Sequence, residues 1–120
     1  QPGIYSARWA KKHGNFYKAG KKILELVRKK NKNKKQKNMK AKFICSLTLC
    51  YEKNKLITTV GAIEGKISEC QLGKNGFGYD PIFIPKGSLK TFGQMSKKKK
   101  ILMDHRYLAF KKMKLKINTL

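Results

Sequence analysis

Apolar residues between Asn15 and Lys30 recur at the spacing of one helix face. The apolar members of this face are Phe16, Ile23, Leu24 and Val27. Asn15 stands immediately before the pattern, and its short side chain can accept a hydrogen bond from the first turn. The pattern therefore predicts an amphipathic helix over this range with Asn15 as its N-cap.

The middle of the chain changes to the alternating pattern of a strand. Apolar and polar residues alternate from Lys42 to Tyr51, and residues 52–55 suit a hairpin turn. A second strand is predicted from Leu56 to about Ser68. It contains Gly61 and Gly65, which indicate a bulge or a close approach of another backbone.

The last third combines a glycine-rich loop with helical segments. The loop runs from Gly73 to Tyr79 and is followed by a short apolar strand at 82–84. Ser96 is placed to cap a short turn, and Asp104 to cap a longer helix. The apolar residues assigned to that helix are Leu108, Phe110, Met113 and Ile117.

Charge changes this picture, because the chain has 30 Lys and Arg against 6 Asp and Glu, a formal net charge of +24. Residues 28–40 hold eight of these positive charges without apolar periodicity, which predicts a mobile lysine-rich loop. Clustered lysines neutralise phosphates and favour a polyanion partner. Lys outnumbers Arg 27 to 3, however, and we favour compositional drift toward a solvated lysine surface as the explanation of the charge, with a selected binding surface as the alternative.

Other features restrict the classes of protein. The longest apolar run, at 43–51, is shorter than the ~18 residues of a membrane span, and the first residues lack a signal-peptide core. The three cysteines, Cys45, Cys50 and Cys70, form no Cys-x-x-Cys pair. We therefore expect buried free thiols, a cytoplasmic location and no membrane partner.

Two segments carry candidate chemistry. Residues 75–81 combine two aromatic rings and a carboxylate with glycines, which suits stacking against a planar base. A plain turn with two core aromatics is the alternative. His105 and Arg106 follow Asp104 at a predicted helix start, where free N–H groups attract anions, although a solvated helix start has the same pattern. Lys100 lies one turn earlier, within a run of four lysines.

Three blocks of sequence resemble the inosine triphosphatase family, also called dITP/XTP pyrophosphatases. They are PGIYSAR at 2–8, NGFGYDPIF at 75–83, and KTF-x-x-MS-x4-ILMDHR-x-x-A at 90–109. The blocks follow the family's order and spacing, so the resemblance extends over essentially the whole chain.

The resemblance implies an α/β fold with a mixed, twisted sheet, flanking helices and two lobes around a substrate cleft. Residues 1–120 would form a single domain, the C-terminal two-thirds of an inosine-triphosphatase-like domain that lacks its N-terminal part. The implied activity is hydrolysis of non-standard purine nucleoside triphosphates (ITP, dITP, XTP) to monophosphate and pyrophosphate, which removes them from the nucleotide pool.

Seven residues match the family's nucleotide-contacting positions. They are Phe77, Gly78, Tyr79 and Asp80 in the loop that holds the nucleotide, Lys100 as the substrate-binding lysine, and His105 with Arg106 as a substrate-contacting pair. Inosine and xanthosine present an acceptor at position 6 and adenine presents a donor. Cationic donors therefore favour 6-oxopurines, by about 1–3 kcal/mol for each good contact.

The sequence departs from the family at two positions. Asp104 replaces the usual Ser; it caps a helix equally well, but its carboxylate would repel a 6-oxo group if it faced the pocket. Gln94 replaces an acidic residue, which we interpret as surface drift.

Pyrophosphate release also requires Mg²⁺ held by carboxylates and a base that activates water. In the family these residues precede the first block, so we expect the base and the Mg²⁺ ligands upstream of Gln1. We accordingly assign no catalytic residue and no metal ligand to this chain, and expect it to be inactive alone. Family members are commonly homodimers, and the resemblance carries that expectation too.

Two other interpretations stay open. One is a small basic nucleic-acid-binding protein that uses the lysine-rich segment 28–40. The other is an inert product of a decayed gene.

Overall fold

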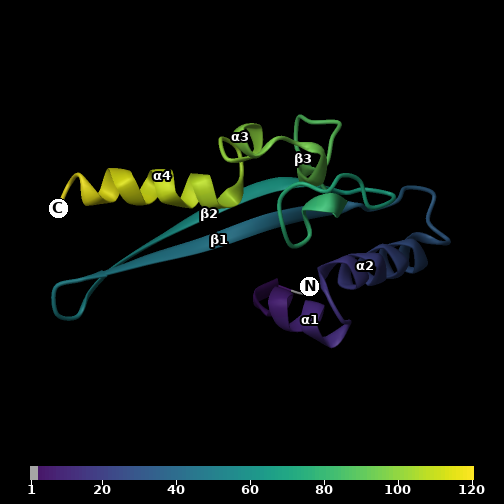
Figure 1. Cartoon of the computed structure of the whole chain (residues 1–120), viewed down its shortest axis with the longest axis horizontal. Coiled ribbons are helices and arrows are strands. Elements are labelled where there is room, and N and C mark those ends of the chain that lie inside the picture. The colour runs from purple at the N-terminus through teal and green to yellow at the C-terminus, as the bar shows by residue number, and fades with distance from the viewer. Residues whose placement is uncertain (1–2) are drawn as a thin grey trace.

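The computed structural model describes residues 3–120, so Gln1 and Pro2, with which the predicted Pro2–Gly3 turn begins, lie outside the described residues. The molecule is elongated, measuring 52 × 29 × 28 Å, and a long two-stranded ribbon runs along it (Figure 1). Its helices are α1 (Ser6–Lys12), α2 (Phe16–Asn31), α3 (Lys97–Lys100) and α4 (His105–Ile117), and its strands are β1 (Lys40–Tyr51), β2 (Lys55–Ile67) and β3 (Phe83–Pro85). Short 3-10 turns cover Gly3–Tyr5, Asp80–Ile82 and Phe92–Gln94.

The sheet has the order β1-β2-β3. β1 and β2 form an antiparallel hairpin whose register runs from Lys40 opposite Lys66 to Tyr51 opposite Lys55. β3 adds to β2, also antiparallel, with Gly65 opposite Pro85. The α/β class with flanking helices is confirmed, and the three strands of the described part pair antiparallel throughout, whereas the resemblance predicts a mixed sheet.

Alternation along the hairpin divides it into two faces. In β1 every second residue, from Ala41 to Tyr51, is partly buried, as the sequence pattern predicts. Helix α4 packs along β2 and β1, and the Thr59 hydroxyl donates to the Ala109 carbonyl at 2.8 Å. The other face carries exposed apolar side chains, among them Ile44 and Val60.

Both predicted caps of the longer helices are present. The Asn15 side chain accepts from the Lys18 N–H at 2.8 Å, and Asp104 accepts from the Tyr107 N–H at 2.8 Å. The apolar face assigned to α4 needs a correction, because Phe110 and Ile117 are exposed. The buried residues of α4 are Ala109 and Met113. The small residue Ala109 lies at the contact between α4 and β2, because the helix packs close to the β2 backbone.

The predicted loop 28–40 is shorter than expected. Residues 28–31 continue α2, and Lys40 already belongs to β1. Asn31 is buried, and its side chain holds the two ends of the remaining loop together. Its Nδ2 donates to the Asn38 carbonyl at 3.0 Å, and its Oδ1 accepts from the Asn38 N–H at 3.1 Å. The lysines between these two residues therefore sit on a closed loop.

An aromatic cluster forms the core beside β3. Phe83 and Phe92 are fully buried, and Phe43 stacks on Phe83 with ring centroids 4.1 Å apart. Met95 completes the buried group. This cluster supports the glycine-rich loop and α3, the segments that carry the candidate site. Phe83 lies shortly after the loop in the chain, and Phe92 lies shortly before α3.

The cysteines differ from the expectation of buried thiols. All three are free, but Cys50 and Cys70 are exposed and Cys45 is half-buried. Cys50 points to the open face of the hairpin, where no helix covers it. In residues 3–120, no helix is both long enough and apolar enough to cross a membrane.

Candidate functional site

The glycine-rich loop is held in place by backbone contacts to the segment before α3. The Thr91 hydroxyl donates to the Leu72 carbonyl at 2.6 Å, and the Asn75 side chain donates to the Met95 carbonyl at 2.9 Å. Gly73 has φ +89°, and a Cβ there would lie 2.0 Å from the Gly93 carbonyl carbon. Only glycine fits, because two backbones meet at this point.

A buried ion pair joins this loop to α3. Lys100 Nζ lies 2.5 Å from Asp80 Oδ2, and their side chains are 8% and 3% exposed. The same oxygen accepts from the Phe77 N–H at 2.9 Å. A Cβ at Gly76 would lie 2.1 Å from Asp80 Oδ2, so the absent side chain leaves room for the carboxylate. Lys100 is therefore buried in an ion pair, whereas the other three lysines of the run at 97–100 are exposed.

The Phe77 ring is in contact with two cations. Its ring centroid is 4.2 Å from Lys100 Nζ and 4.2 Å from Arg106 Cζ. These distances are within the range of cation–π attraction. Phe77 as a whole is 53% exposed, so part of this aromatic side chain remains accessible beside two hydrogen-bond donors. Three of the seven predicted residues thus meet at one point although they come from two separate blocks of the sequence.

His105 and Arg106 occupy the first turn of α4, as predicted. His105 lies edge-on to Phe43, with centroids 5.1 Å apart, and its Nδ1 is buried without a hydrogen-bond partner. Burial lowers the pKa of His105, while the neighbouring Asp104 carboxylate opposes the shift and the Arg106 and Lys100 charges add to it. Burial thus favours the neutral form of the imidazole, which can donate from one nitrogen and accept at the other.

Tyr79 and Gly78 hold the loop against the N-terminal part of the chain. The Tyr79 hydroxyl donates to the Ser6 carbonyl at 2.7 Å, and its ring lies edge-on to Phe16 at 5.3 Å. Burial raises the pKa of this phenol. Of the two aromatic residues predicted for base stacking, Phe77 is therefore the accessible one. Gly78, with φ +63°, adopts the left-handed conformation that glycine accepts most readily.

Both departures from the family pattern have a structural role. Asp104 is buried and is engaged as the α4 cap. Gln94, which we interpreted as surface drift, accepts through Oε1 from the Thr91 N–H at 3.0 Å and completes a capping box.

Gly61 also contributes to this site, although its sequence position does not indicate which element it contacts. A Cβ on Gly61 would lie 2.1 Å from the His105 carbonyl oxygen and 2.4 Å from the Ala109 nitrogen. The first turn of α4 therefore rests directly on the β2 backbone. The glycine itself was the available signal, because it predicted a close backbone approach without naming the partner.

The carboxylates near the site do not suit a magnesium ion. Among residues 3–120 no three His, Cys, Asp or Glu side chains cluster as metal ligands would. Asp80 is already neutralised by Lys100, and Asp104 caps α4. The described residues thus do not provide the several oxygen ligands that Mg²⁺ requires.

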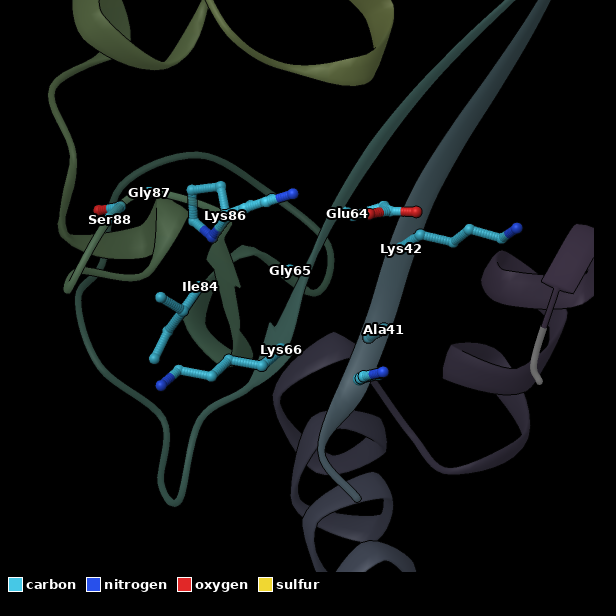
Figure 2. Close-up of a pocket in the computed structure, with 11 residues that line it drawn as sticks. Ala41, Lys42, Glu64, Gly65, Lys66, Ile84, Lys86, Gly87 and Ser88 are labelled. Carbon is cyan, nitrogen blue, oxygen red and sulfur yellow. The ribbon is translucent and has the colours of Figure 1, made fainter. Parts of the chain in front are cut away.

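A groove of about 740 Å³ lies elsewhere, across β1, β2 and the segment after β3 (Figure 2). None of the seven predicted nucleotide-contacting residues lines it.

Comparison with known proteins gives consistent matches over nearly the whole chain. The model of the Ham1 family matches residues 1–116. A dITP/XTP pyrophosphatase of Clostridium tetani is 40% identical over 118 residues, which are 98% of this chain and 56% of that protein. The dITP/XTP pyrophosphatase of Dictyoglomus thermophilum is 42% identical over 94% of this chain and 53% of its own length. The chain thus spans about half the length of the curated relatives it matches.

Solved structures agree with the sequence matches. A HAM1 protein from Coxiella burnetii superposes with a TM-score of 0.85 at 28% identity, covering 99% of this chain and 59% of that one. The Ham1 protein of Staphylococcus aureus gives a TM-score of 0.78 at 31% identity, with the same coverage. From the matched model and these structures, the chain belongs to the Ham1 family.

Proposed function

We propose that this chain supplies the base-recognition part of a pyrophosphatase that hydrolyses non-standard purine nucleoside triphosphates, such as dITP and XTP, to monophosphate and pyrophosphate. The family membership and the names of the relatives support this reaction. The observation that carries the proposal is the meeting of Phe77 with Lys100 and Arg106.

The chemistry of the meeting point favours a 6-oxopurine. Phe77 is partly exposed and offers an aromatic surface for contact with any planar base, which adds affinity without selecting among bases. Selection comes from the donors beside it, since Lys100 and Arg106 cannot accept a hydrogen bond. A 6-oxo group would be satisfied there, and the 6-amino group of adenine would be left unpaired.

The buried pair gives Lys100 a defined position. Asp80 holds the ammonium in place and is itself held by the Phe77 N–H, so cation, loop backbone and aromatic ring form one connected unit. We infer that Asp80 acts by positioning Lys100 rather than by contacting the base. Gly78 and Tyr79 act by shaping and anchoring the same loop.

The catalytic step needs groups that the described residues do not assemble. We propose that the water-activating base and the Mg²⁺ ligands lie in the part of the enzyme that this chain does not span, and that the chain alone does not hydrolyse ITP. Mg²⁺ would stabilise the charge on the triphosphate when bound. A homodimer and a cytoplasmic location follow from the family resemblance and belong to the same proposal.

The direct test is a binding comparison on the chain of residues 1–120. Inosine triphosphate and adenosine triphosphate are titrated by calorimetry, and we expect the inosine form to bind about 5–150-fold more tightly, which is the 1–3 kcal/mol of one good polar contact. Arg106→Gln should remove most of this preference. Arg28→Gln is the matched control: Arg28 donates to the Glu69 carbonyl, away from the site, so the same charge is lost without loss of preference.

Equal affinity for both nucleotides would contradict the proposed base recognition. A pyrophosphate-release assay with Mg²⁺ tests the second part separately, because measurable turnover by the purified chain would overturn the assignment of catalysis to other residues.

A further inference from the structure

A second cationic surface lies at the end of the β1–β2 hairpin that is farthest from its turn at residues 52–54. The groove in Figure 2 is lined by Lys40 and Lys42 from β1, Lys66 from β2 and Lys86 just after β3. We call these residues the lysine groove. Glu64 is the one carboxylate among the lining residues, so the groove has a net positive charge.

The positive charges of the lysine groove are only partly compensated within the described residues, since Lys42 alone lies directly opposite the Glu64 carboxylate. Lys40 and Lys66 are direct cross-strand partners, an arrangement in which like charges destabilise a sheet. The ion pairs found in residues 3–120 are Lys22–Glu25, Lys55–Glu52 and Lys100–Asp80, and none includes a groove lysine. A bound anion would relieve this repulsion.

The lysine loop continues the same surface. The Asn31–Asn38 clamp closes residues 32–37 into a loop, and the exposed lysines it presents are Lys32, Lys34, Lys35 and Lys37. The Met39 carbonyl then accepts from the Ile67 N–H at 2.7 Å, which ties the end of the loop to the start of the groove. The loop therefore ends beside the groove, which brings two groups of lysines to the same end of the hairpin.

The direction of the side chains indicates the shape of the partner. Lys42 and Lys66 lie on the same face of the hairpin, but in Figure 2 their side chains run in opposite directions instead of converging on one point. A small anion needs convergent donors, whereas an elongated polyanion can contact lysines that point apart. Neither the loop nor the groove contains arginine, the residue suited to bidentate reading of bases.

We propose that the lysine groove and the clamped loop bind the phosphate backbone of nucleic acid, without base preference. A polynucleotide presents phosphates at regular spacing, and each one neutralised by a lysine releases condensed counterions. This surface is separate from the nucleotide site, so its function does not depend on the proposed hydrolysis.

The test is fluorescence anisotropy of the chain of residues 1–120 with labelled, mixed-sequence single-stranded DNA of increasing length. We expect affinity to rise with length. The logarithm of the binding constant should fall with the logarithm of salt concentration by about 0.7 for each phosphate contacted. Four contacts give a slope of about −3, or roughly a 50-fold loss between about 50 and 200 mM salt.

Variants that each lose three lysines distinguish binding by this surface from attraction by the overall positive charge. Lys40→Gln/Lys66→Gln/Lys86→Gln should reduce the magnitude of the slope by about 2. A second variant, Lys34→Gln/Lys35→Gln/Lys37→Gln, changes only exposed loop positions and should weaken binding even if the groove variant fails to fold. The control, Lys53→Gln/Lys111→Gln/Lys114→Gln, removes the same charge from exposed positions of the β1–β2 turn and of α4, elements that extend away from the groove (Figure 1).

Two outcomes would overturn the proposal. One is an equal loss in the control and in both test variants, which would mean that overall charge alone attracts DNA. The other is tighter binding to phosphatidylcholine vesicles that contain phosphatidylserine than to DNA, which would assign the surface to a membrane.

Discussion

The buried Lys100–Asp80 pair allows a stability prediction with an internal control. Lys100→Met keeps the length of the side chain but leaves the Asp80 carboxylate, only 3% exposed, with a single donor, the Phe77 N–H. Removing one partner of a buried pair costs about 3–5 kcal/mol, because the other charge stays desolvated. We expect Lys100→Met to lower the free energy of unfolding by that amount.

The control is the ion pair of Lys55 with Glu52 in the hairpin turn. It spans 3.1 Å, but its side chains are 57% and 67% exposed. Water already solvates both charges, so Lys55→Met should cost no more than about 1 kcal/mol. Both variants remove one lysine from an ion pair, and they differ chiefly in burial.

Urea unfolding followed by circular dichroism measures both losses. The double variant Asp80→Asn/Lys100→Met should recover part of the stability, since it removes both charges of the buried pair and the asparagine can still accept from the Phe77 N–H. Losses of similar size in Lys100→Met and Lys55→Met would refute the reasoning, because burial would then not determine the value of the pair.

Three further predictions concern the elements around the site. Gly61→Ala places a Cβ 2.1 Å from the His105 carbonyl, so it should destabilise the chain by about 1–3 kcal/mol in urea unfolding, whereas Ala62→Ser on the exposed face should change little. Asp104→Ala should cost about 0.5–2 kcal/mol through the lost cap and Asp104→Ser much less, and equal losses would contradict the capping role. Because burial lowers the pKa of His105, the unfolded chain binds a proton first as pH falls below the ordinary value of about 6.5. Stability should therefore decrease from that pH down to the lowered pKa, and this part of the pH dependence should be absent in His105→Gln unfolding curves.

Local signals predicted most of the elements. Asn15 and Asp104 could be assigned as caps because capping depends on a residue and the three that follow it. The strands followed from alternation, which depends only on which face is covered. The apolar face of α4 was predicted incorrectly because β2 contacts the helix at the small Ala109, so the larger Phe110 is left in solvent.

Contacts between residues far apart in the sequence could not be predicted from local patterns. Lys100 is chemically identical to its three neighbours in the sequence, and family resemblance alone distinguished it; its burial depends on Asp80, twenty residues earlier. The anchor of Tyr79 on Ser6 joins residues 73 positions apart, and no local pattern indicates a backbone acceptor at that distance. The convergence of Phe77 with Arg106 likewise depends on tertiary structure.

The position of β1 at the end of the strand order affects how this chain behaves at high concentration. In residues 3–120 the strand is paired only with β2, so one row of its backbone N–H and C=O groups is open along twelve residues. Lys40 and Lys42 place positive charges at the beginning of β1, but the stretch from Ile44 to Cys50 contains no charge. Such an edge is a template for a strand from another molecule, and charged residues are the usual protection against it. Self-association through added strands should therefore begin at this segment, and a single lysine introduced at Ser46 would be the smallest change expected to keep the chain dispersed.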